Sequence, residues 1–193
     1  NVAKYVSPKF SGFQASVAYD FGGRVKTGAT NYDNHGYSAL LTWGNDKFTV
    51  EGAYLGVQDY DNTPGEKLNS FAFDGVAKVT DALSLTAHWE RAKLSQEDYK
   101  RDYFGAGAVY GVGKWAVIAQ YLQANESKVA GVKQDDGAYQ VKLGARYSLS
   151  KQTTAFAGVS YIDNDNNGAF GTATGVGGDT GSRAGTVSVS LRT

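Results

Sequence analysis

The chain has 193 residues with 19 basic and 19 acidic side chains, and it contains neither cysteine nor methionine. This length suffices for one domain, and the balanced charge does not indicate a nucleic acid or an acidic substrate as a partner. The lack of cysteine excludes disulfides and thiolate metal sites. The lack of methionine leads us to expect a processed chain or a piece of a longer one. No window approaches 18 consecutive apolar residues, so the sequence predicts no membrane-spanning helix.

Alternation of apolar and polar residues predicts about eleven antiparallel β-strands and no helix, because successive side chains of a strand point to opposite sides. The stretch from Tyr139 to Tyr147 shows this pattern, with Gln140, Lys142 and Arg146 on the side opposite the two tyrosines. In chain order, the predicted strands span residues 1–7, 12–21, 35–44, 48–58, 70–80, 83–93, 102–111, 115–126, 137–149, 153–162 and 184–193.

The connections between these strands alternate between short and long along the whole chain. The short ones carry the Gly, Asn, Asp and Pro residues that tight turns select, and they span residues 7–12, 44–47, 80–82, 111–114 and 149–152. The long ones are polar, charged or glycine-rich, and they span residues 22–34, 59–69, 94–101, 127–136 and 163–183. We therefore expect tight turns at one end of the sheet and large loops at the other.

The predicted strands have about the ten residues that a tilted strand needs to cross a bilayer, whereas strands of soluble proteins average about 5–6. Their middle apolar positions are mostly Ala, Val, Leu and Gly, which would fill a protein core poorly. Aromatic residues gather near strand ends, as expected at a membrane interface: Tyr19, Phe21, Trp43, Phe48, Trp115, Tyr139, Tyr147 and Tyr161. These features favour a transmembrane β-barrel over a soluble β-sandwich.

Three segments carry a resemblance to a known family. The segment "NVAKYVSPKFSGFQASVAYDFGG" (1–23) resembles a strand, turn and strand found midway through the general diffusion porins of Gram-negative bacteria, most closely those of β-proteobacteria. The segment "LGARYSLSKQTTAFAGVSYIDN" (143–164) is similar to their GARY strand, turn and returning strand. The segment "AGTVSVSLRT" (184–193) resembles their last strand. The matches cover both ends of the chain and its strand rhythm throughout.

The resemblance implies a passive channel in the outer membrane, an integral protein built as a sixteen-stranded antiparallel barrel and usually a homotrimer in the lipid bilayer. Residues 1–193 would then form a single porin barrel domain, the C-terminal part of a longer chain. We expect five N-terminal strands and the constriction loop to be missing. Family members typically end in an aromatic residue, whereas this chain stops at Thr193, so we also expect a short missing tail.

Alternation places a set of ionisable residues on the inward side of the predicted barrel. The predicted pore-lining residues are the cations Lys4, Lys78, Lys142, Arg146 and Arg192, the anions Glu51, Asp74 and Glu90, and His88. By resemblance, Lys4 stands where the family often has arginine, and Arg146 belongs to the GARY-like segment. The excess of cations predicts a channel for small hydrophilic solutes and ions that prefers anions. A plainer interpretation of each residue is a solvated position in the wall.

Other functions find little support in the sequence. The carboxylates could be a glycosidase pair, but nothing sets two of them at the needed separation. The run "DNDNNG" (163–168) opens like an EF-hand loop, yet its twelfth position is Thr174 instead of glutamate. We therefore predict no enzyme, no cofactor, no metal and no nucleic acid. The alternatives left open are a substrate-selective channel of the same fold and a surface binding module like an adhesin or lectin.

Overall fold

The computed structural model describes residues 1–27, 30–171 and 180–192, and nearly all of them belong to one antiparallel sheet. Polar and apolar residues alternate along most of its strands, which is why the segments adopt extended structure. The strands are β1 (Val2–Val6), β2 (Phe13–Thr27), β3 (Thr30–Gly44), β4 (Phe48–Gln58), β5 (Lys67–Lys78), β6 (Leu83–Leu94), β7 (Tyr99–Val112), β8 (Trp115–Ala124), β9 (Lys128–Val129), β10 (Val132–Lys133), β11 (Ala138–Ser148), β12 (Thr154–Asn164) and β13 (Arg183–Arg192).

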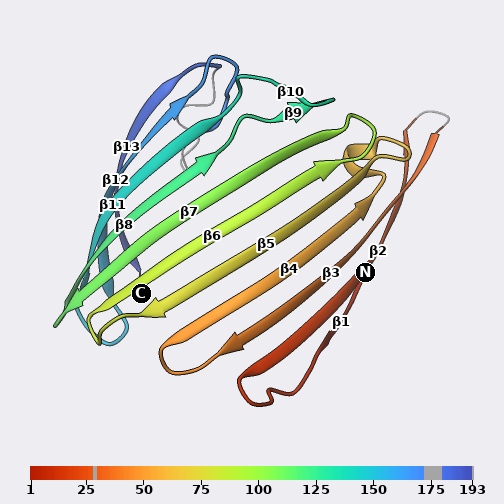
Figure 1. Cartoon of the computed structure of the whole chain (residues 1–193). Helices are drawn as coiled ribbons and strands as arrows, with labels where there is room; N and C mark the ends of the chain where they lie inside the picture. The colour runs from red at the N-terminus through yellow and green to blue at the C-terminus, as the bar shows by residue number, and fades with distance from the viewer. Residues whose placement is uncertain (28–29, 172–179, 193) are drawn as a thin grey trace.

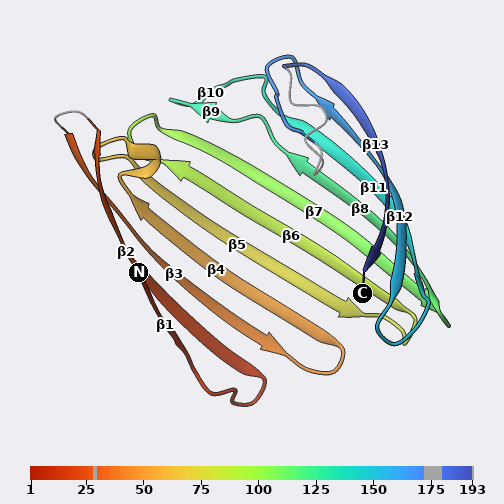
Figure 2. The same cartoon turned by 180° about the vertical axis from the view of Figure 1, so that it is seen from behind.

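Neighbouring strands in the sheet are almost always neighbours in the chain. The hydrogen-bonded order is β1-β2-β3-β4-β5-β6-β7-β8-β11-β12-β13, and β9 and β10 form a small hairpin beside β7. The strands run side by side in a curved sheet, with tight turns along one end and the longer connections along the other (Figure 1). In the described residues β1 and β13 do not pair, so the sheet is an open, curved wall, as the view from behind also shows (Figure 2).

The main path of eleven strands matches the eleven predicted from alternation. Three predicted long loops are wrong in part, because β2 and β3 extend through most of residues 22–34, only residues 95–98 separate β6 from β7, and the short strands β9 and β10 lie within residues 127–136. Residues 22–34 and 95–101 are mostly polar or glycine in the sequence, so alternation gives no signal there. One turn of 3-10 helix, η1 (Tyr60–Asn62), was also not expected. Thr174 and Thr193, each part of a prediction, lie outside the described residues.

A β-bulge interrupts the pairing of β2 with β3 between Asp20 and Gly23. At its centre Gly22 has φ 65°, a left-handed conformation that costs least for glycine. A Cβ atom at this position would lie 1.6 Å from the carbonyl oxygen of Asn34. Glycine at this position therefore allows β2 to bend at the bulge, where its regular part meets the extension over residues 23–27.

The register gives the sheet two chemically different faces. The apolar face carries Trp43, Val141 and Leu143, whereas the polar face carries Gln140 and Lys142. Buried apolar side chains are few, and the three below 10% exposure, Ala116, Ala138 and Ile162, all lie on the polar face. Side chains converge on the concave side of a curved sheet and shield one another, so the polar face is the concave one. No helix of the described residues is long and apolar enough to span a membrane.

Candidate functional site

The polar face brings together every ionisable residue that alternation placed on the inward side. Directly paired residues share a face, and the pairings of all neighbouring strands follow one continuous pattern from β1 to β13. All nine predicted residues therefore lie on the polar face: Lys4, Glu51, Asp74, Lys78, His88, Glu90, Lys142, Arg146 and Arg192.

The acidic residues form one cluster around His88 on β4, β5 and β6. Glu51 lies opposite Asp74, and Asp74 lies opposite His88, whose Nδ1 is 2.7 Å from Asp74 Oδ1. The Nε2 atom of the same ring is 3.8 Å from Glu90 Oε2, which is too far for a hydrogen bond. The sequence places these residues on one face, but only the register between strands brings them into contact.

Two hydroxyl groups hold the carboxylates of this cluster in place. Thr42 Oγ1 donates a hydrogen bond of 3.0 Å to Glu51, and Ser70 Oγ donates one of 2.6 Å to Glu90. Sequence reasoning did not identify either hydroxyl as part of the site, since Ser and Thr are common on any wet strand face. In the described part of the chain no hydroxyl group forms a hydrogen bond with His88 Nε2.

The five cations are spread over the sheet instead of clustering. Lys142 and Arg146 lie four residues apart on β11, and Arg192 lies opposite Thr154 on β12. Lys4 is on the edge strand β1, and Lys78 ends β5 beside a tight turn. Among the described residues none of the five forms an ion pair with a carboxylate. Their charges are therefore available to ions in solution, whereas Asp74 faces an imidazole.

A buried ion pair fixes the connections at the long-loop end of the polar face. Arg101 on β7 bonds to Asp136, which also accepts bonds of 2.7 Å from both the backbone N–H and the hydroxyl of Ser127. The Arg101 guanidinium also lies 5.0 Å from the ring of Phe170. This cluster was not predicted, because Arg101 and Asp136 are 35 residues apart in the sequence and follow no periodic pattern.

One carboxylate accepts four of the hydrogen bonds that hold the connection from β4 to β5. Glu66 Oε1 accepts hydrogen bonds from the backbone N–H groups of Lys67, Ser95 and Gln96 and from the Ser95 hydroxyl. Burial alone would raise the pKa of Glu66, but these hydrogen bonds together lower its pKa below the usual range. The ionised side chain therefore ties residues 59–66 to the β6–β7 turn.

The apolar face has aromatic rings near both ends of the strands. At the turn end, Phe13 pairs with Trp43 and Trp115 with Tyr147, the latter with ring centroids 4.6 Å apart. At the long-loop end the ring pairs include Tyr19 with Phe21, Tyr37 with Tyr54, and Tyr139 with both Tyr121 and Tyr161. All eight aromatic residues predicted at the interface lie on this face: Tyr19, Phe21, Trp43, Phe48, Trp115, Tyr139, Tyr147 and Tyr161.

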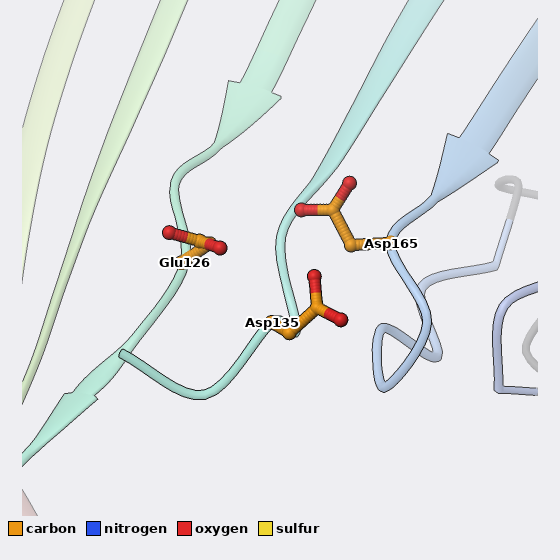
Figure 3. Close-up of side chains that lie close together, drawn as sticks. All are labelled: Glu126, Asp135 and Asp165. Atoms are coloured by element: carbon orange, nitrogen blue, oxygen red, sulfur yellow. The ribbon is translucent and has the colours of Figure 1, made fainter. Parts of the chain in front are cut away.

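Three carboxylates approach one another beyond the ends of β8, β11 and β12. One oxygen each of Glu126, Asp135 and Asp165 lies within 4.8 Å of the others (Figure 3). Only Asp165 belongs to the run that resembles the start of an EF-hand loop. Lys133 already pairs with Glu126 at 2.5 Å, and an amide of Asn166 donates to Asp135 at 2.6 Å. We therefore assign no metal ion to this cluster.

Comparison with known proteins identifies the family. A family model described as "Gram-negative porin" matches residues 1–167, most of the chain. The chain belongs to the Gram-negative porin family. It is 28% identical over 182 residues to the major outer membrane protein P.IB of Neisseria meningitidis serogroup A, covering 90% of this chain and 54% of that protein. It is 29% identical over 188 residues to outer membrane porin protein 32 of Delftia acidovorans, covering 89% of this chain and 48% of that protein.

Solved structures of porins share the fold of this chain. An anion-selective porin from Comamonas acidovorans superimposes with a TM-score of 0.87 at 19% identity, over 100% of this chain and 58% of that one. The outer membrane protein OmpT of Vibrio cholerae, in its trimer form, superimposes with a TM-score of 0.69 at 13% identity, over 99% of this chain and 64% of that one. This porin thus has the antiparallel architecture of a porin β-barrel.

The family assignment confirms several predictions made from the sequence. This porin is an integral protein of the Gram-negative outer membrane, and the relatives that it matches are named as outer membrane proteins or porins. It spans about half of the length of the relatives that it matches. This share agrees with a partial chain, whereas the number of missing strands and the role of each polar-face residue stay predictions.

Proposed function

We propose that this porin forms part of the wall of a diffusion channel for small hydrophilic solutes and ions, and that the complete protein is a homotrimer. The observation that carries the proposal is the division of one continuous sheet into two faces. The polar face would line water, and the apolar face, with aromatic rings near both strand ends, would contact lipid. The missing strands, five by our count, would complete the barrel and supply the constriction loop.

We further propose that the channel prefers anions. Five cations of the polar face have no carboxylate partner among the described residues, and the three carboxylates lie together beside His88. Unpaired wall charges bias which sign of ion enters a water-filled pore. The name of the Comamonas acidovorans structure, an anion-selective porin, supports the same preference at low identity.

The test is the reversal potential of the full-length protein in a planar bilayer under a potassium chloride gradient. We expect channels with a chloride preference. Channels with a cation preference would refute the anion proposal, and no conductance from correctly folded protein would refute the channel itself. A current that one sugar or anion blocks at low concentration would favour the second candidate, a substrate-selective channel of the same fold.

A further inference from the structure

Four lysines occupy directly opposed positions on four neighbouring strands at the long-loop end. Lys93 on β6 lies opposite Lys100 on β7, which lies opposite Lys128 on β9, which in turn lies opposite Lys133 on β10. Strands are spaced about 4.8 Å apart, so neighbouring lysines start from backbone positions about 5 Å apart. We call these four residues the lysine row.

The lysine row is electrostatically unfavourable on its own. Like charges directly opposite one another destabilise a sheet. Lys133 pairs with Glu126 at 2.5 Å, and this contact raises the pKa of Lys133. In the part of the chain that the structure describes, Lys93, Lys100 and Lys128 form no ion pair. An anion placed between them would remove the repulsion.

The lysine row lies on the apolar face, just beyond its aromatic rings. Along β6 the residues on this face are Trp89, Arg91 and Lys93, and along β7 they are Phe104, Asp102 and Lys100. The opposed residues between the rings and the lysines form an ion pair, with Arg91 Nε 2.7 Å from Asp102 Oδ1. Successive residues on one face of a strand are about 7 Å apart along the strand. If the rings mark the membrane interface, the lysines are at the level of lipid headgroups.

A hollow of about 530 Å³ opens beside the lysine row. Arg91, Lys100, Lys128 and Lys133 line it together with the ring of Tyr139, one of the interface aromatics. Its carboxylates are Asp102 and Glu126, each paired with a cation, and Asp165, one oxygen of which lies within 4.8 Å of a Glu126 oxygen. The hollow is thus lined by four cations and three carboxylates, which leaves one positive charge uncompensated, and by an aromatic ring that belongs to the apolar face.

We propose that Lys93, Lys100 and Lys128 bind the phosphate headgroup of an anionic membrane lipid, whose hydrocarbon chains extend over the aromatic rings of the apolar face. The proposal rests on the proposed contact of that face with lipid. A lipid phosphate fits better than free phosphate because the hollow is continuous with the apolar face. Each lysine near an anionic lipid contributes about fivefold to its binding.

The experiment uses the full-length protein in nonionic detergent micelles and counts retained lipids by native mass spectrometry. The probe is dimyristoyl phosphatidic acid. The comparison lipid is dimyristoyl phosphatidylcholine, which has the same hydrocarbon chains but no net charge. The test variant is the triple substitution Lys93→Gln, Lys100→Gln and Lys128→Gln. The matched control replaces three exposed lysines of the tight turns with the same change of charge: Lys47→Gln, Lys114→Gln and Lys151→Gln.

We expect the wild type and the control to retain phosphatidic acid, and the triple variant to bind it about a hundredfold more weakly. Without anionic lipid, the triple variant should also have a higher melting temperature than the wild type, because the repulsion is gone. Equal loss in both variants, or no loss in the triple variant, would overturn the proposal. If inorganic phosphate displaced all of the bound phosphatidic acid, the proposal that the ligand is a lipid would be overturned. Unchanged conductance of the triple variant would separate these outcomes from a failure of the channel itself.

Discussion

Lys142 is the polar-face cation whose effect on ion selectivity is easiest to isolate. It lies in the middle of β11, and its directly opposed neighbours, Gln120 and Ser160, are both uncharged. No described carboxylate pairs with it. The substitution Lys142→Gln removes one charge and keeps a polar side chain of similar reach. It should therefore change selectivity without changing the sheet.

The size of the effect follows from Coulomb's law in a water-filled pore. An ion that passes about 6 Å from the lysine ammonium interacts with it by about 0.7 kcal/mol in water, and salt screening reduces this to about 0.3 kcal/mol. The change has opposite signs for chloride and potassium, so their ratio shifts by about 0.6 kcal/mol. Lys142→Gln should thus lower the chloride-to-potassium permeability ratio about threefold, and Lys142→Glu about tenfold.

The measurement is the reversal potential of single channels of the full-length protein in a potassium chloride gradient. Lys151→Gln, which changes an exposed lysine next to a tight turn, is the matched control and should leave the ratio unchanged. Higher salt should weaken the effect of Lys142→Gln. A ratio that is the same in the wild type and in both Lys142 variants would show that this residue does not face the conduction path.

Three further predictions concern stability. In Gly56→Ala the new Cβ would lie 2.6 Å from Cζ of Tyr37. The melting temperature should therefore fall, with a loss of about 1–3 kcal/mol in the free energy of unfolding. Gly75→Ala is the control and should have little effect, because no atom beyond its chain neighbours lies within 4 Å of the new Cβ. In the variant Glu66→Gln, trypsin should cut after Lys67 about tenfold faster at neutral pH, because a neutral amide accepts weaker hydrogen bonds than the carboxylate. The wild type should lose this protection only as the pH falls through the lowered pKa of Glu66. Arg101→Met should leave Asp136 without a cationic partner and speed amide hydrogen exchange in residues 125–137, with a loss of about 3 kcal/mol in the free energy of unfolding. Adding Asp136→Leu should not restore this stability, because the buried N–H and hydroxyl of Ser127 would lose their acceptor.

The regular part of the sheet could be predicted because one face is apolar and the other polar along its whole width. β4 has the predicted bounds, residues 48–58, since a turn with Asn and Asp precedes it and alternation continues to its end. The prediction failed for the extensions of β2 and β3, where most residues are polar or glycine and the period of two disappears from the sequence. Strand pairing there depends on backbone hydrogen bonds across the bulge, which leave no pattern in side-chain type.

The candidate site could be predicted only as a set of residues, without its contacts. Alternation decides that Asp74 and His88 share a face, but the register of the β5–β6 hairpin decides that they lie opposite each other. The same holds for the lysine row, since β9 and β10 are too short to show a period. The Arg101 to Asp136 pair joins distant segments, and no local rule relates them.

The order of the strands has a consequence for how such a wall is assembled and varied. Along the main path each strand hydrogen-bonds only to the strands before and after it, with the β9–β10 hairpin set to one side. Every contact can therefore form by closing a hairpin on a strand already in place, which keeps the chain entropy of each step small. A hairpin added or removed changes the width of the wall and leaves the register of the remaining pairs intact. The hairpin is thus the unit by which a wall of this kind can change its size.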